Sequence, residues 1–203
     1  MPQHPWNDMY VAGTLPWDTG TPESMLVAFI ASGAVAPGRA LDIGAGTGTN
    51  ARWLAAQGFD VLGVDIASSA VEQARGKLAG ERCRFEIADF LAAPPAGPFD
   101  FVFDRGCFHV FDDAADRARF AANVARVLAP GGLWLSMIGS TEGAPRDHGP
   151  PRRSARDIAE AIEPVLAIHE LSAAEFSDGM PFATAWRCVS RPREAPAQPS
   201  TAR

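Results

Sequence analysis

Residues 41–50, with the sequence LDIGAGTGTN, constrain the fold of this chain more than any other segment. Residues 39–43 predict a strand, and residues 47–57 predict a helix. Between them, Gly44, Gly46 and Gly48 allow the backbone to turn tightly and to approach a ligand closely. In an open parallel sheet, ligands bind beyond the carboxyl ends of the strands, where this turn lies. The segment therefore predicts a strand–turn–helix unit that binds a nucleotide-like ligand.

The rest of the chain continues the alternation of strand and helix. Residues 60–65, 83–87, 99–103, 133–138, 165–171 and 182–190 are expected to form strands, the last two as a hairpin. Helices are expected from Ser68 or Ser69 to about residue 78, with Glu72 completing a capping box, from Asp112 or Asp113 to the Pro-Gly-Gly stop at 130–132, and from Ser154 to about residue 163. This order predicts an α/β fold, a three-layer α/β/α sandwich around a mostly parallel seven-stranded sheet with an antiparallel closing strand.

A length of 203 residues suits one domain with a proper core. We expect residues 1–38 to form an N-terminal lid segment and a helix near residues 23–34, and residues 192–203, rich in Pro, Ala and Ser, to be disordered. No apolar run reaches the ~18 residues of a membrane helix, and the N-terminus lacks an apolar signal core. The three cysteines are widely spaced, which predicts neither disulfides nor a metal site. The expected location is the cytoplasm.

The net charge of −6, from 18 basic and 24 acidic residues, argues against a nucleic-acid partner. The one dense basic cluster is a Pro/Gly-rich loop with Arg146, Arg152, Arg153 and Arg156. We expect this loop to be a solvated face or a lid over the site. A small molecule is the expected partner, with no nucleic acid and no membrane, and the expected assembly is a monomer or a weak homodimer.

Asp42 and Thr49 indicate the kind of ligand. A dinucleotide site would carry glycine at position 49, and an acid at position 42 would repel a pyrophosphate in a low-dielectric cleft. S-adenosylmethionine carries an ammonium and a sulfonium and no phosphate, so it suits Asp42. Asp65 ends the second strand and is expected to accept hydrogen bonds from both ribose hydroxyls, a feature that NAD enzymes share. Asp89 either receives the adenine amino group or is a turn residue.

Five successive segments resemble the motifs of class I S-adenosylmethionine-dependent methyltransferases: LDIGAGTG, VLGVDIA, ADF, FDFVFDRGCFHVF and VLAPGGLWLSMI. The resemblance covers residues 39–138 in order. It implies a Rossmann-like fold, a methyltransferase domain over residues 39–191, and S-adenosyl-L-methionine as the cofactor, with S-adenosyl-L-homocysteine as product. The predicted cofactor-binding residues are Trp6, Trp17, Asp42, Gly44, Ala45, Gly46, Asp65, Ile66, Asp89, Phe90 and Asp104.

Two segments are similar to the thiopurine and halide/thiol methyltransferase group. Residues 6–18, WNDMYVAGTLPWD, resemble the segment that folds over the cofactor in that group. Residues 103–106, FDRG, resemble the turn after the fourth strand of thiopurine methyltransferases, which implies that Arg105 lies near the substrate sulfur. The following Cys107-Phe108-His109 departs from the thiopurine pattern and leaves the acceptor open.

The predicted catalytic residues are Arg105, His109 and Asp18. Arg105 would favour a thiolate by lowering its pKa, or it would brace the loop by pairing with Asp104 or Asp112. His109 is the candidate general base for an oxygen or nitrogen acceptor, or a packed structural histidine. Asp18 either binds substrate or caps a turn. The leading hypothesis is S-methylation of a thiol or similar soft nucleophile. The alternatives are O- or N-methylation of a small metabolite and, more remotely, an NAD-dependent oxidoreductase or a non-catalytic cofactor-binding protein.

Overall fold

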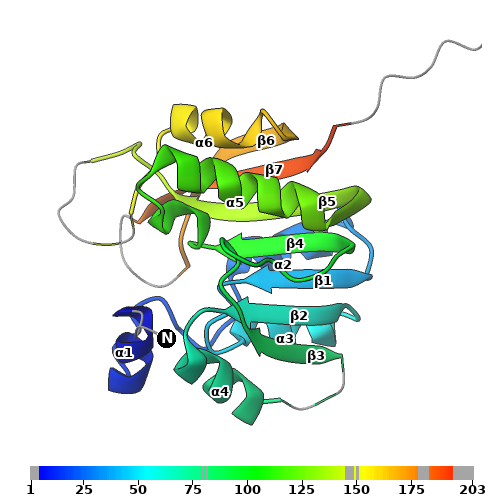
Figure 1. Ribbon diagram of the computed structural model, residues 1–203, viewed down its shortest axis with the longest axis vertical. Coiled ribbons are helices and arrows are strands. Elements are labelled where there is room, and N and C mark those ends of the chain that lie inside the picture. The colour runs from blue at the N-terminus through cyan, green and yellow to red at the C-terminus, as the bar shows by residue number, and fades with distance from the viewer. Residues whose placement is uncertain are drawn as a thin grey trace, which may run out of the picture.

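A computed structural model describes residues 5–78, 80, 82–144, 149, 151–177 and 183–193 (Figure 1). Its centre is a seven-stranded sheet in the order β3-β2-β1-β4-β5-β7-β6. The strands are β1 (Arg39–Ile43), β2 (Asp60–Asp65), β3 (Cys83–Ile87), β4 (Phe99–Arg105), β5 (Leu128–Gly139), β6 (Leu166–Glu175) and β7 (Thr184–Pro192). β7 runs antiparallel to both of its neighbours, whereas β1 to β5 are parallel. The predicted fold class is confirmed.

Helices cover both faces of the sheet (Figure 1). They are α1 (Pro5–Ala12), α2 (Ser24–Ala31), α3 (Thr49–Ala56), α4 (Ser68–Gly76), α5 (Ala114–Val127) and α6 (Ala155–Ile162), with a short 3₁₀ turn at Phe108–Val110. Buried residues of α2, α3 and α4 share one cluster with the sheet, and those of α5 and α6 share another. None of the described helices has the length and apolar character that crossing a membrane requires.

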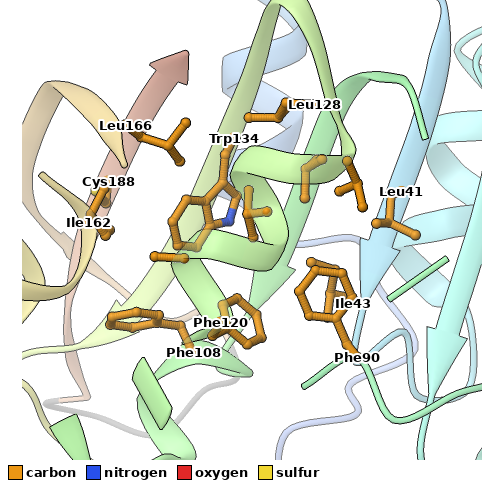
Figure 2. Packing of buried hydrophobic residues seen from close by; sticks show 14 of the residues in the cluster. Leu41, Ile43, Phe90, Phe108, Phe120, Leu128, Trp134, Ile162, Leu166 and Cys188 are labelled. Atoms are coloured by element: carbon orange, nitrogen blue, oxygen red, sulfur yellow. The ribbon is translucent and has the colours of Figure 1, made fainter. Parts of the chain in front are cut away.

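The side-chain alternation of β4 explains how the sheet supports two cores. Val102 belongs to the cluster under α5 and α6, whereas Phe101 and Phe103 belong to the cluster under α2, α3 and α4. Phe99 departs from this alternation and joins the cluster of Val102, and the strand register shifts between Phe99 and Phe101. Because successive side chains of a strand point to opposite faces, a continuous apolar run fits a strand that is buried on both sides. On the α5 face, Trp134 packs against Phe108 and Phe120 at ring distances of 5.9 Å each (Figure 2).

The helix boundaries depart from the prediction at two places. The expected cap of α4 by Ser68 or Ser69, with Glu72, is wrong: Ala67 precedes the helix, Ser68 is its first residue, and the cap carries no side-chain hydrogen bond. Instead, Asn7 from the N-terminal segment accepts the Ser69 N–H at 2.9 Å. Residues 130–132 were expected to separate helix and strand, but α5 ends at Val127 and β5 includes this Pro-Gly-Gly turn.

At its two ends, the chain is described from residue 5 and as far as residue 193. The N-terminal segment contains helix α1, which was not expected, followed by α2 at the place expected for a helix. Of the tail at residues 192–203, only residues 192 and 193 are described, and Pro192 ends β7. The division at residues 38 and 191 stays a prediction.

Candidate active site

A cavity of about 760 Å³ lies at the carboxyl ends of β1, β2 and β4. Its walls come from the glycine loop, the name we give to residues 44–48, from the N-terminal segment, from the connection after β4, and from Phe176 at the end of β6. Among the residues predicted from the sequence, those that line it are Trp6, Trp17, Asp18, Gly44, Ala45, Gly46, Asp65, Ile66, Asp89, Phe90, Arg105 and His109. The fold thus brings together in one cavity twelve of the side chains and loop positions that were predicted separately.

The carboxylate of Asp65 holds the glycine loop in place through hydrogen bonds. The Asp65 carboxylate accepts the Gly46 N–H at 2.8 Å through Oδ2 and the Ala67 N–H at 2.9 Å through Oδ1. Gly46 has a φ of 55°, and a Cβ placed there would lie 2.8 Å from the Tyr10 hydroxyl oxygen. Position 46 therefore requires glycine for its backbone conformation and for its distance to the N-terminal segment.

The N-terminal segment lies over this loop as a lid. The Trp17 ring contacts the Trp6 ring at 5.8 Å and the Tyr10 ring at 6.4 Å, both edge to face. Asp18 accepts the Thr47 hydroxyl at 2.7 Å and the Gly20 N–H at 3.3 Å, so it both ties the lid to the loop and caps its own turn. Burial, followed by the charge of Asp65, raises the pKa of Tyr10 well above its usual value.

Arg105 is anchored by Glu23, not by either partner that the sequence suggested. The Arg105 Nε lies 2.6 Å from Glu23 Oε2, and its Nη1 donates to the Trp17 carbonyl at 3.3 Å. The guanidinium carbon is 5.1 Å from the centre of the Phe176 ring. Asp112 pairs with Arg153 instead. Arg105 therefore joins the start of α2, the lid and the end of β6 at one wall of the cavity.

Two predicted residues, Asp42 and Asp104, do not line the cavity but lie buried behind its wall. Asp104 accepts the N–H groups of Cys107 at 3.1 Å and Phe108 at 3.0 Å, and the Trp134 indole N–H at 2.9 Å. Burial raises the pKa of Asp104 to about 6. Burial and the charges of Asp104 and Asp65 also raise the pKa of Asp42, whose Oδ2 finds no hydrogen-bond partner among the described residues. Asp104 therefore organises the turn after β4.

Asp89 makes the contacts of a turn residue while it also lines the cavity. Its Oδ1 accepts the N–H groups of Leu91 at 2.9 Å and Ala92 at 3.1 Å. The neighbouring Phe90 is buried, with its ring 5.0 Å from that of Phe120. Both interpretations of Asp89 are therefore compatible with its position.

His109 is held in one tautomer by the backbone. Its Nδ1 accepts the Gly139 N–H at 2.7 Å, and its ring lies 6.0 Å from that of Phe176. Since Nδ1 is an acceptor here, the neutral ring carries its proton on Nε2. The Nδ1 lone pair is therefore engaged by the backbone, as in a packed structural histidine, while the ring still lines the cavity.

Replacing His109 with asparagine is expected to preserve thiol methylation to within about threefold, because asparagine retains an acceptor for Gly139 N–H and no base is lost. His109→Ala leaves that buried N–H without its acceptor and should lower the free energy of unfolding by ~1–3 kcal/mol. Steady-state kinetics and chemical denaturation of both variants measure these effects. A loss of ~10²–10⁴-fold in kcat for His109→Asn would instead identify a general base.

Several residues of the cavity were missed by sequence reasoning. Tyr10, Phe111 and Phe176 line it, and Glu23 sits behind Arg105. Tyr10 lies in the segment predicted to form the lid, so the signal was present there. Glu23 and Phe176 approach Arg105 only through the tertiary fold, and no local pattern marks them. Cys107 also lines the cavity, and burial raises the pKa of its thiol, which fits a wall residue better than a nucleophile.

Comparisons with known proteins agree with the geometry. Residues 40–132 match a family described as "Methyltransferase domain". A probable thiol methyltransferase 2 of Arabidopsis thaliana is 31% identical over 150 residues, covering 72% of this chain and 65% of the relative. A 2-heptyl-1-hydroxyquinolin-4(1H)-one methyltransferase of Mycobacteroides abscessus is 28% identical over 170 residues, covering 81% and 74%. The chain thus matches just under two thirds of the length of the Arabidopsis relative.

Solved structures agree on the fold. One reported for the conversion of a disulfide bond into a thioacetal group during echinomycin biosynthesis superposes with a TM-score of 0.79. It is 24% identical and covers 95% of this chain and 92% of that one. The cover extends beyond residues 40–132, so the likeness includes the lid segment and the closing strands.

Proposed function

We propose that the chain is a class I S-adenosylmethionine-dependent methyltransferase that methylates the sulfur of a small organic thiol, since it matches a methyltransferase domain over residues 40–132 and is similar to a probable thiol methyltransferase. The observation that carries the proposal is that a single cavity contains both the glycine loop and the guanidinium of Arg105. Two functions that the sequence assigned to separate segments, cofactor binding and acceptor binding, therefore have a common space.

The residues at the loop end of the cavity suit S-adenosylmethionine. Asp65 ends β2 beside the glycine loop, and both of its carboxylate oxygens accept backbone N–H groups there, so a carboxylate acceptor for the ribose hydroxyls is held at this end of the cavity. Thr49 lines the cavity at the start of α3 with a buried hydroxyl that lacks a partner among the described residues. A hydroxyl at a helix N-terminus suits the carboxylate of the methionine moiety. Trp6 and Trp17 line the same cavity, which supports a role for them in covering the bound ligand.

Methyl transfer to sulfur requires little acid–base catalysis by the protein. When bound, the cofactor supplies a methyl group on a sulfonium, a leaving group that is already activated. The thiol first releases its proton to water, a new carbon–sulfur bond then forms in line as the old one breaks, and a thioether leaves. The work of the chain is to orient the sulfur, exclude water and favour the thiolate, and a cation such as Arg105 favours the thiolate.

The acceptor end of the cavity supports an organic acceptor of appreciable size. Trp17, Val110, Phe111 and Phe176 form its apolar walls around Arg105 and His109. The bond from Gly139 N–H to Nδ1 makes His109 a poor base for an oxygen or nitrogen acceptor. O-methylation is retained as a second candidate because the Mycobacteroides relative is named for a hydroxyquinolinone.

The direct test is formation of S-adenosylhomocysteine by the purified chain with a panel of alkyl and aryl thiols. We expect turnover with organic thiols and a loss of ~10–100-fold in kcat/KM for Arg105→Met, since a positioned charge next to the reacting sulfur is removed. Arg187→Met is the matched control, because Arg187 pairs with Glu170 on β6 and lies outside the cavity. No product with any thiol, but turnover with hydroxyquinolines, would replace S-methylation by O-methylation.

A further inference from the structure

We infer that Glu23 is a specificity-determining residue of the methyltransferase, which cancels the charge of Arg105 and so makes the site select organic thiols over small inorganic anions. The inference rests on the proposed function. Iodide and thiocyanate are soft nucleophiles that a positively charged site would attract. Glu23 is not predicted from any motif, and it caps α2 next to Arg105.

Glu23 is fixed in place on several sides. Its side chain is fully buried, and that of Arg105 is 13% exposed. Oε1 lies 3.5 Å from the Met25 N–H that it caps, Oε2 lies 3.5 Å from the Ser177 N–H, and the Glu23 N–H donates to Asn50 Oδ1 at 2.9 Å. The carboxylate therefore cannot move away from the guanidinium without breaking the cap of α2.

The charge balance of the cavity follows from this pair. Among the described residues that line the cavity, Arg105 is the single lysine or arginine, whereas Asp18, Asp65 and Asp89 are acids. Asp65 and Asp89 lie at the cofactor end, and Asp18 is hydrogen-bonded to Thr47. Asp104 and Asp42 lie behind the wall, and His109 faces the site as a neutral ring. With Glu23 2.6 Å from Arg105, the pair acts on the acceptor as a dipole, whose attraction for an anion falls off faster than that of a lone charge.

Apolar contact then decides which acceptor binds. The rings of Trp17, Phe111 and Phe176 offer an organic thiol a surface that leaves water on binding. A monatomic or triatomic anion gains little from these rings and must lose its hydration for a compensated charge. The same guanidinium, held near Phe176, retains enough local polarity to orient a thiolate sulfur.

The experiment compares Glu23→Gln with the wild type on two acceptors, potassium thiocyanate and benzyl mercaptan. We expect the ratio of kcat/KM for thiocyanate to that for benzyl mercaptan to rise at least ~10-fold, because the guanidinium loses a negative charge 2.6 Å away and attracts the anion more strongly. The acidic limb of the kcat–pH profile for benzyl mercaptan should move to lower pH, since the bound thiolate is stabilised. Glu23→Asp, which keeps the charge, should retain the wild-type ratio. Glu170→Gln, which removes a carboxylate from an arginine pair outside the cavity, is the matched control.

The double variant separates an electrostatic role from the capping role. Loss of the α2 cap lowers the folded fraction equally for both acceptors, so it cancels in the ratio. In an Arg105→Met background, Glu23→Gln should no longer change the ratio. An unchanged ratio in Glu23→Gln, or a change that persists without Arg105, would overturn the inference while leaving S-methylation intact. A wild-type protein that methylates no thiol would overturn the proposed function itself.

Discussion

Replacing Asp65 with alanine is expected to weaken the binding of S-adenosylmethionine at least ~100-fold, which corresponds to ~3 kcal/mol. The carboxylate has two tasks at once. It holds the glycine loop through the N–H groups of Gly46 and Ala67, and it offers charged acceptors to the ribose hydroxyls of the proposed cofactor. Each hydrogen bond to a charged group contributes ~1.5–3 kcal/mol, so the loss of two exceeds a factor of one hundred. Isothermal titration calorimetry measures the dissociation constant directly.

Asp60 provides the matched control at the opposite end of the same strand. Its side chain is 49% exposed and pairs with Arg84, which is also half exposed. Such a surface pair contributes ~0–1 kcal/mol, and it lies away from the cavity, so Asp60→Asn should leave the dissociation constant unchanged. Asp65→Asn keeps one acceptor for the loop and should retain the fold but bind weakly. Wild-type affinity in Asp65→Asn would show that the ribose does not depend on this carboxylate.

The strands and the loop end of the cavity could be predicted from the sequence because their signals are local. β1, β2 and β3 have the predicted boundaries, since each is a short segment with turn residues on both sides, a pattern that is typical of a strand. The positions of Gly44, Gly46 and Asp65 around one ligand follow from a parallel sheet, in which strand ends meet at one edge. No tertiary information is needed for either step.

The helix α1 could not be predicted, because its stability is tertiary. Its eight residues are too few for an isolated helix, and Gly13 follows directly, with Pro16 three residues later. Asn7 binds the first turn of α4, and the Tyr10 carbonyl accepts a hydrogen bond from Gln73 at 3.2 Å. Figure 1 shows α1 beside α4. Packing against α4 stabilises the helix, although the segment has little helix propensity of its own.

The ion-pair partner of Arg105 could not be predicted from the sequence for a related reason. Asp104 and Asp112 were natural candidates because they are close in sequence, but side chains of adjacent strand residues point to opposite faces of the sheet. Arg105 faces the cavity, whereas Asp104 faces Trp134 on the side of α5. Glu23, 82 residues away, approaches from the start of α2. The alternation of β4 thus excludes the neighbour and admits the distant residue.

The second large effect is expected at Asp104, which should be among the most destabilising sites of the chain. Asp104→Ala leaves the Cys107 and Phe108 amides and the Trp134 indole N–H without their common acceptor. Each unsatisfied buried donor costs ~1–3 kcal/mol, so the free energy of unfolding should fall by ~3–5 kcal/mol after the relief of burying a charge. Urea denaturation followed by tryptophan fluorescence measures it.

Replacing Asp104 with asparagine keeps some of its three hydrogen bonds and loses another. Its amide oxygen retains the two loop N–H groups, but its amino group faces the Trp134 indole donor, so one contact becomes repulsive. Trp134→Phe removes that donor. We expect the combined Asp104→Asn and Trp134→Phe variant to lose less stability than the sum of the single changes, by ~1–2 kcal/mol. Simple additivity would show that the indole does not depend on Asp104.

The pH dependence follows from the raised pKa of Asp104, about 6 in the folded protein against 3.8 as its ordinary value. Between pH 4 and 6 the folded state then binds more protons at this site than the unfolded state, so Asp104 contributes less stability as the pH rises through this window. Asparagine does not titrate, and it removes the Asp104 charge that raises the pKa of Asp42, which changes the difference between the two proteins in the same direction. The stability advantage of the wild type over Asp104→Asn should therefore decrease from pH 4 to 6 in parallel urea titrations. An advantage that increases over this window would mean that the three hydrogen bonds outweigh burial and hold the pKa of Asp104 below its ordinary value.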